Sequence, residues 1–296
     1  MMVYMKKLTL IALLYMQGLV TPIAVHASLH PEQPLSTAPP KSIFKQWAKP
    51  IAPFKIAPQV WYVGTKNLTS ILITTEEGHV LIDAGLSESA ELIQSNIEKL
   101  GFNIKDVKYI LNSHARLDQA GGIRKLKEIS GASVISNTIN AEQLALGGAN
   151  DFALGNALLF PPVKVDLILN DNESFELSGV VFTALLTPGH LPGSTSWKVK
   201  LNNNDILIYA DSLATPGYYL VNNLNYPDIV SDLHYSYQIL NNQEVDIFIA
   251  SKGDRFNLLD KIKNLNNGDE KAFYDANGLK LYVEKSRVSL ISQLNK

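Results

Sequence analysis

The chain has 296 residues, of which 46% are hydrophobic and 18% are charged, and its mean hydropathy is near zero. This balance is typical of a globular protein and excludes a fibrous chain or one that is disordered throughout. Lys and Arg number 26 against 28 Asp and Glu, so no basic excess points to a nucleic-acid partner. Cysteine is absent, which excludes disulfides, thiol nucleophiles and cysteine-ligated metal centres.

The first 27 residues have the pattern of a secretory signal peptide. Lys6 and Lys7 precede an apolar run from Leu8 to Val20, which is shorter than the ~20 residues that a membrane-spanning helix needs. Val25 and Ala27 are the small residues expected before a cleavage site. We therefore predict a periplasmic protein with no membrane attachment after cleavage.

Residues 28–58 are rich in proline, and we expect an extended N-terminal arm there rather than a helix. The rest of the chain, residues 59–296, alternates short β-branched segments with amphipathic ones and predicts one α/β domain with two sheets and outer helices. In this domain Ser87 is expected to cap a helix that ends at Gly101. The predicted strands are 60–64, 69–75, 79–83, 107–111, 180–186, 196–201, 206–210 and 245–250, and the further helices are 119–130, 228–241 and 279–294.

Polar side chains follow four of these strands, at the point where each strand ends. They are His114, His190, Asp211 and Lys252. Because α/β sheets assemble their sites just beyond the carboxyl ends of strands, we expect a functional site where these side chains meet.

Two motifs carry the chemistry. In LNSHARLDQAGG, residues 111–122, an imidazole and a carboxylate lie within one turn at His114 and Asp118, and both are good zinc ligands. In LTPGHLPGSTSW, residues 186–197, two Pro–Gly pairs fix His190 in a tight loop. Each motif alone also fits a purely structural role, in which the polar groups only satisfy one another.

These motifs, together with WAKPIAPFKIAPQVWYVGT, GHVLIDAG and PGYYLVNNLNYPDIVSDL, resemble the metallo-β-lactamases from about Trp47 to the C-terminus. The resemblance is to their third subclass, which lacks a zinc-binding cysteine and has serine at that position, here Ser212. It implies the αββα sandwich of the metallo-β-lactamase fold, with zinc at the edge of the two sheets. The predicted domain over residues 59–296 is then a hydrolase domain of this type.

Three of the zinc ligands that the family uses are replaced in this chain, as in a minority lineage of the subclass. Arginine cannot bind zinc because its guanidinium is never deprotonated, and two cations beside the site oppose a second zinc ion. The resemblance therefore implies one zinc ion, held by the remaining ligands with a position left open for water. The six positions are His114, Arg116 and His190 for the first metal, and Asp118, Gln119 and Lys252 for the second.

The resulting prediction is a zinc-dependent β-lactam hydrolase, in which zinc-bound hydroxide attacks the β-lactam carbonyl. We expect Asp118 to be a zinc ligand beside His114 and His190, and to orient the water. Arg116 and Lys252 would stabilise the developing anion or bind the substrate carboxylate. Gln119 and Ser212 would complete the substrate site. The alternative role for the two cations is structural, with Arg116 paired to Asp118.

Two other functions fit the same residues. One is an exported metallo-hydrolase of this fold that acts on another ester, lactone or amide, because function depends on the site rather than the fold. The other is a non-catalytic protein whose cationic pocket binds an anion. In either enzymatic case the partner is a small molecule, and the protein is expected to be a monomer.

Overall fold

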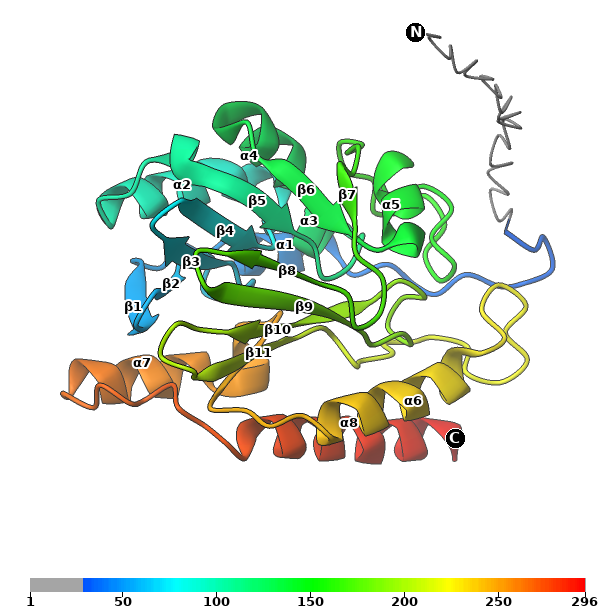
Figure 1. The fold of residues 1–296 in the computed structure, drawn as a ribbon. Helices are drawn as coiled ribbons and strands as arrows, with labels where there is room; N and C mark the ends of the chain where they lie inside the picture. The colour runs from blue at the N-terminus through cyan, green and yellow to red at the C-terminus, as the bar shows by residue number, and fades with distance from the viewer. Residues whose placement is uncertain (1–28, 296) are drawn as a thin grey trace, which may run out of the picture.

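Two β-sheets stacked face to face, with helices on both outer sides, form the αββα sandwich that the sequence predicts (Figure 1). The structure is a computed structural model that describes residues 29–295, so the predicted signal peptide lies outside the described residues. None of the helices in that range combines the length and the hydrophobicity of a membrane-spanning segment.

The first sheet has seven strands in the order β1-β2-β3-β4-β5-β6-β7. Strands β1 to β4 pair antiparallel, and β4 to β7 pair parallel. Parallel strands β4, β5 and β6 end at one edge of the sheet, and the loop after β5 carries the first predicted motif. The bounds are Phe54–Ala57 (β1), Val60–Tyr62 (β2), Ile71–Thr75 (β3), Gly78–Ile82 (β4), Val107–Leu111 (β5), Ser133–Ser136 (β6) and Leu167–Ile168 (β7).

The second sheet has five strands in the order β12-β11-β10-β9-β8. Strands β8 to β11 pair antiparallel, whereas β11 and β12 are parallel and therefore end at the same edge. The bounds are Ser174–Leu177 (β8), Val180–Leu186 (β9), Thr195–Lys200 (β10), Ile206–Ala210 (β11) and Ile247–Ala250 (β12).

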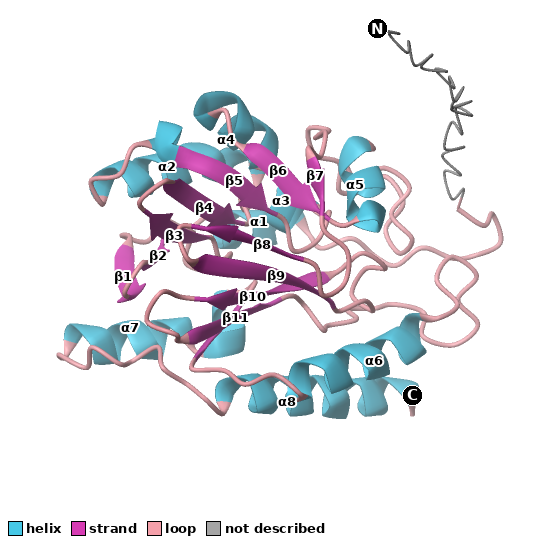
Figure 2. Cartoon of the chain, in the orientation of Figure 1, coloured by secondary structure: helices cyan, strands magenta, loops and turns pink. Residues whose placement is uncertain are grey.

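Helices cover the outer face of each sheet (Figure 2). Helices α2 and α4 contact each other on the first sheet, and α6 and α8 contact each other on the second. Strands β1, β6, β7 and β8 and helices α1, α5 and α7 have no counterpart among the predicted elements. The helix bounds are Lys41–Trp47 (α1), Ala90–Lys99 (α2), Leu117–Ala120 (α3), Ile123–Ser130 (α4), Thr138–Ala145 (α5), Ile229–Asn241 (α6), Leu258–Asn266 (α7) and Gly278–Leu294 (α8), with 3-10 turns at Ser87–Ser89, Ile104–Asp106 and Gly253–Phe256.

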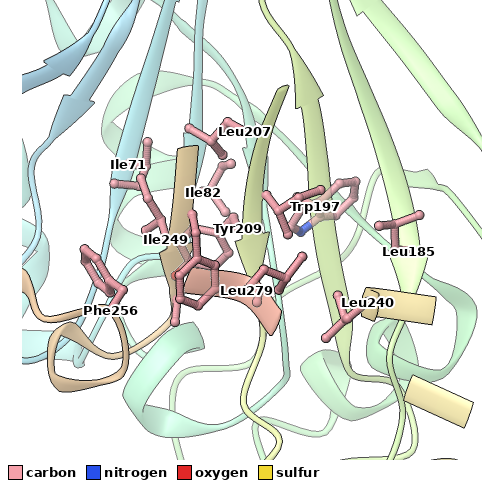
Figure 3. Packing of buried hydrophobic residues seen from close by; sticks show 14 of the residues in the cluster. Ile71, Ile82, Leu185, Trp197, Leu207, Tyr209, Leu240, Ile249, Phe256 and Leu279 are labelled. Carbon is pink, nitrogen blue, oxygen red and sulfur yellow. The ribbon is translucent and has the colours of Figure 1, made fainter. Parts of the chain in front are cut away.

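The core lies mainly between the sheets. Figure 3 shows Ile71 and Ile82 of the first sheet in the same cluster as Trp197 and Tyr209 of the second, and all four are fully buried. Because neighbouring residues of a strand point to opposite faces, Leu72 belongs instead to a second cluster under helices α2 and α4. This two-sided burial holds the strands rigid up to the edge where the motifs emerge.

The prediction of an extended arm without a helix is wrong for Lys41–Trp47, which form helix α1. The prolines bracket this segment: Pro40 is its N-cap residue, with φ −65°, and no proline follows before Pro50. Proline is compatible with the start of a helix because N–H groups there have no intrahelical acceptor, so the N–H that proline lacks is not missed. The expected cap at Ser87 is also wrong, because its Oγ donates to the Gly121 carbonyl instead.

Candidate active site

The four strand ends that the sequence singled out converge at one edge of the sandwich. Strand β5 leads into His114, β9 into His190, β11 into Asp211 and β12 into Lys252. The His114 and His190 rings lie with centroids 5.0 Å apart, and His114 Nδ1 is 2.7 Å from Asp211 Oδ1. The two sheets therefore bring together residues that are up to 138 positions apart in the chain.

The buried carboxylate of Asp83 anchors the loop after β5. Asp83 Oδ1 accepts a bond of 2.7 Å from Ser113 N, and Asp83 Oδ2 accepts bonds of 2.6 Å from Ser113 Oγ and 2.8 Å from Tyr209 Oη. Burial raises the pKa of Asp83 to about 7 despite these bonds. At Gly122 an added Cβ would lie 2.4 Å from the Ala84 carbonyl oxygen, so only glycine allows this close approach.

His114 is fully buried and is oriented through its Nδ1 atom, which bonds Asp211. Its Nε2 atom lies 3.5 Å from Asp118 Oδ1 and makes no hydrogen bond within residues 29–295. Burial lowers the pKa of His114, but the carboxylates of Asp211 and Asp118 outweigh this effect and raise that pKa to about 10. Without a metal the imidazole is therefore protonated.

His190 is oriented in the same way by a backbone acceptor. Its Nδ1 donates to the Ala214 carbonyl at 2.6 Å, which leaves Nε2 as the free nitrogen. Burial, together with the charges of Arg116 and His114, lowers the pKa of His190 to about 3. The imidazole is therefore neutral, which is the form that binds metals.

Asp118 and Lys252 form an ion pair at the edge of the site. Lys252 Nζ lies 2.9 Å from Asp118 Oδ2, and 4.0 Å from the ring centroid of Trp47 at the end of α1. Burial raises the pKa of Asp118, but Lys252 and His114 outweigh it and hold that pKa well below its usual range. The helix that the sequence did not predict thus supplies one wall of the site.

Arg116 forms an ion pair, as the structural alternative expected, but its partner is Asp151 and not Asp118. Its Nε and Nη2 atoms donate to Asp151 at 2.7 and 2.8 Å, and its Nη1 donates to the Tyr218 hydroxyl. Arg116 and Asp151 are both 5% exposed. Asp151 carries no sequence signal: it lies in an irregular loop outside every motif, so its pairing is visible only in the structure.

Gln119 is bound to the backbone beside Lys252 rather than facing the cavity. It is fully buried, and its Nε2 donates to the Ser251 carbonyl at 2.8 Å. It is not among the residues that line the neighbouring cavity. Its position therefore gives no support to the predicted contact with substrate.

A cavity of about 420 Å³ opens over this edge of the sandwich. The predicted residues Arg116, Asp118, His190, Ser212 and Lys252 all line it. Trp47, Tyr218 and Arg255 also line the cavity, and none of the three is among the predicted site residues. Its volume suits a small organic molecule.

The residues present fit a zinc ion in part. The free Nε2 of His114 and the free Oδ1 of Asp118 are 3.5 Å apart, close to the ~3.4 Å expected between two ligands that each lie about 2.0–2.1 Å from one tetrahedral zinc. The neutral His190, with its Nδ1 bonded, is of the right type for a third ligand. Yet across residues 29–295 no three His, Asp or Glu side chains are gathered closely enough to hold an ion.

The two-sheet sandwich, with histidines and a carboxylate at one edge, is typical of a class of hydrolases, and the comparisons identify that class. The sequence model of the metallo-β-lactamase superfamily matches residues 64–255, so the chain belongs to this superfamily. A solved Cronobacter sakazakii metallo-β-lactamase described by its HARLDQ motif is 58% identical, with a TM-score of 0.90 over 91% of this chain and 98% of that chain. The same six letters occupy residues 114–119 here.

More distant relatives extend the comparison. A subclass B3 metallo-β-lactamase of Bradyrhizobium japonicum is 29% identical, with a TM-score of 0.80 over 85% of this chain and 96% of that chain. A curated N-acyl homoserine lactonase from a Bacillus species is 26% identical over 170 residues, which is 49% of this chain. That match spans only 63% of the lactonase, less than two thirds of its length. The chain thus stands in a B3-like lineage of the superfamily.

Proposed function

We propose that this protein hydrolyses the amide bond of β-lactams at a site that holds one weakly bound zinc ion. The observation that carries the proposal is the 420 Å³ cavity lined by Asp118, His190 and Lys252, with the free Nε2 of His114 beside them. The HARLDQ motif of this chain also occurs in a 58% identical metallo-β-lactamase, and this shared motif supports β-lactams as the substrate class. Export to the periplasm and a monomeric state remain predictions from the sequence.

We assign His114, His190 and Asp118 as the residues that would hold the ion. Zinc lowers the pKa of bound water to about 7, which is the chemistry it would supply here. Asp211 fixes the His114 ring through Nδ1, as carboxylates commonly do for metal-binding histidines. The incomplete ligand set, with Asp118 also tied to Lys252, accounts for weak binding.

The remaining residues act on the substrate and its developing charge. The Lys252 ammonium, held between Asp118 and Trp47, is placed to stabilise the anion that forms as the lactam bond breaks. Ser212 lines the same cavity and offers a hydroxyl to the substrate. Each guanidinium nitrogen of Arg116 already donates to Asp151 or Tyr218, so we assign Arg116 to fixing the walls of the cavity rather than to binding the substrate directly.

A lactonase is the second candidate, because the curated relatives that match half of this chain are N-acyl homoserine lactonases. Lactones and β-lactams are attacked at the same kind of carbonyl, so the site chemistry alone does not separate them. The two substrate classes differ in charge, and that difference is testable.

Zinc removal tests the proposal directly. After treatment with a chelator, carbapenem hydrolysis should disappear, and it should return with added zinc along a saturating curve whose midpoint gives the affinity of the site. The reaction is followed by the loss of β-lactam absorbance. Hydrolysis that continues unchanged in chelator would show that the reaction does not require zinc. No hydrolysis at any zinc concentration would contradict the proposed substrate class.

Restoring the replaced ligands tests the assignment of the site. In the triple variant Arg116→His, Gln119→His and Lys252→His, zinc content measured by atomic emission should rise from one ion per chain to two, because three imidazoles replace two cations and an amide. Circular dichroism controls for folding, since Asp151 loses its partner. A folded variant that still binds at most one ion would show that the site is misassigned.

A further inference from the structure

Among residues 29–295, three Arg and Lys side chains line the cavity, and two of them are paired with buried carboxylates. Arg116 is paired with Asp151, and Lys252 is paired with Asp118. The third is Arg255, whose side chain makes no hydrogen bond to any residue in the range 29–295. Its nearest carboxylate lies on its exposed neighbour in sequence, 3.8 Å from Nε. Arg255 is therefore the most weakly paired of these three cations, because its one ion pair is longer than the other two and lies between exposed side chains.

The position of Arg255 suits recognition of an incoming ligand. It lies in the 3-10 turn after β12, and its backbone N–H donates to the Lys252 carbonyl at 3.0 Å, so it is fixed relative to the ion pair at the cavity edge. Its side chain is 48% exposed. It lines both the cavity and a larger groove of about 980 Å³ between residues 214–221 and helix α8. Arg255 thus borders both the cavity and the groove with a half-exposed side chain.

We propose that Arg255 binds the carboxylate of the substrate and thereby selects anionic substrates over neutral ones. A guanidinium presents a planar fork of N–H donors that matches both oxygens of a carboxylate. Penicillins and carbapenems carry a carboxylate on the ring fused to the lactam, whereas N-acyl homoserine lactones carry no charge. The inference rests on the proposed hydrolase function, and it names the residue that separates the two candidate substrate classes.

The test compares benzylpenicillin with its uncharged methyl ester. In Arg255→Gln, KM for the acid should rise about tenfold, the size expected for one charge-assisted hydrogen-bonded contact, while kcat for the acid and KM for the ester stay near the wild-type values. Arg255→Lys keeps the charge and should recover part of the loss. The matched control is Lys285→Gln, which removes an exposed cation that lines the groove but not the cavity.

Equal changes in KM for the acid and the ester in Arg255→Gln would overturn the inference, as would an equal effect of Lys285→Gln. If the wild-type protein hydrolyses neither compound, the proposed function fails, yet Arg255 is still tested by equilibrium binding followed through tryptophan fluorescence, to which Trp47 in the cavity contributes. A wild-type protein that binds the acid no more tightly than the ester would then contradict the inference. If the wild type binds the acid more tightly than the ester and Arg255→Gln does not, the inference is supported even in the absence of hydrolysis.

Discussion

His114→Ala and His190→Ala should each lower zinc-dependent hydrolysis more than about 100-fold. Changes to residues that only orient a metal ligand commonly cost 10–100-fold, and loss of the ligand itself should cost more. Each variant removes one of the two imidazoles whose Nδ1 is already bonded, to Asp211 or to the Ala214 carbonyl, so that only Nε2 is free. The measurement is kcat/KM across a zinc titration, with zinc content determined on the same samples.

Two further variants grade this result. Asp211→Asn changes only the acceptor of the His114 Nδ1–H. The kcat/KM of this variant should therefore lie between the values of the wild type and of His114→Ala. His234→Ala serves as the control, because this exposed histidine lies on helix α6 and does not line the cavity. Activity and zinc content that stay unchanged in both site variants would exclude these histidines as ligands.

Asp151→Ala should lower the free energy of unfolding by about 3–5 kcal/mol, because it leaves the Arg116 guanidinium buried without its carboxylate. It also removes the acceptor that Asp151 Oδ1 offers to the backbone N–H groups of Ala153 and Leu154, at 2.9 Å each. Urea unfolding at pH 7 measures the loss. The double variant Arg116→Met with Asp151→Leu should lose less than Asp151→Ala, because no charge remains buried.

The same ion pair has a defined pH dependence. Burial raises the pKa of Asp151, but Arg116 outweighs it, so the pKa of this carboxyl is lower in the folded protein than its ordinary value of 3.8. Its stabilisation is therefore complete above that ordinary value and is lost as the pH falls through the lowered folded value. The difference in unfolding free energy between the wild type and Asp151→Ala should narrow only in strong acid. A difference that narrowed already near neutral pH would show that another group dominates.

Several features of this protein are fixed by short stretches of sequence. The predicted bounds of three strands agree with the structure, because β-branched runs between polar turns strongly favour a strand over a helix. These strands are Val107–Leu111, Val180–Leu186 and Ile206–Ala210. The HARLDQ segment and the histidine between two Pro–Gly pairs placed the chain in its family before any contact was known. The replacement of three of the family's zinc ligands can likewise be recognised from the sequence, because it depends only on residue type.

The partners of the charged residues were decided by the tertiary structure. The structural alternative drawn from the sequence paired Arg116 with Asp118, two positions apart. In the structure Asp118 is bound by Lys252 from the other sheet, and Arg116 by Asp151 from a loop without a motif. The wall formed by Trp47 depends likewise on a helix that the surrounding prolines obscured. Local rules describe how a segment folds. Which distant side chains meet at the edge of two sheets depends on strand order, register and loop path, which only the packed molecule defines.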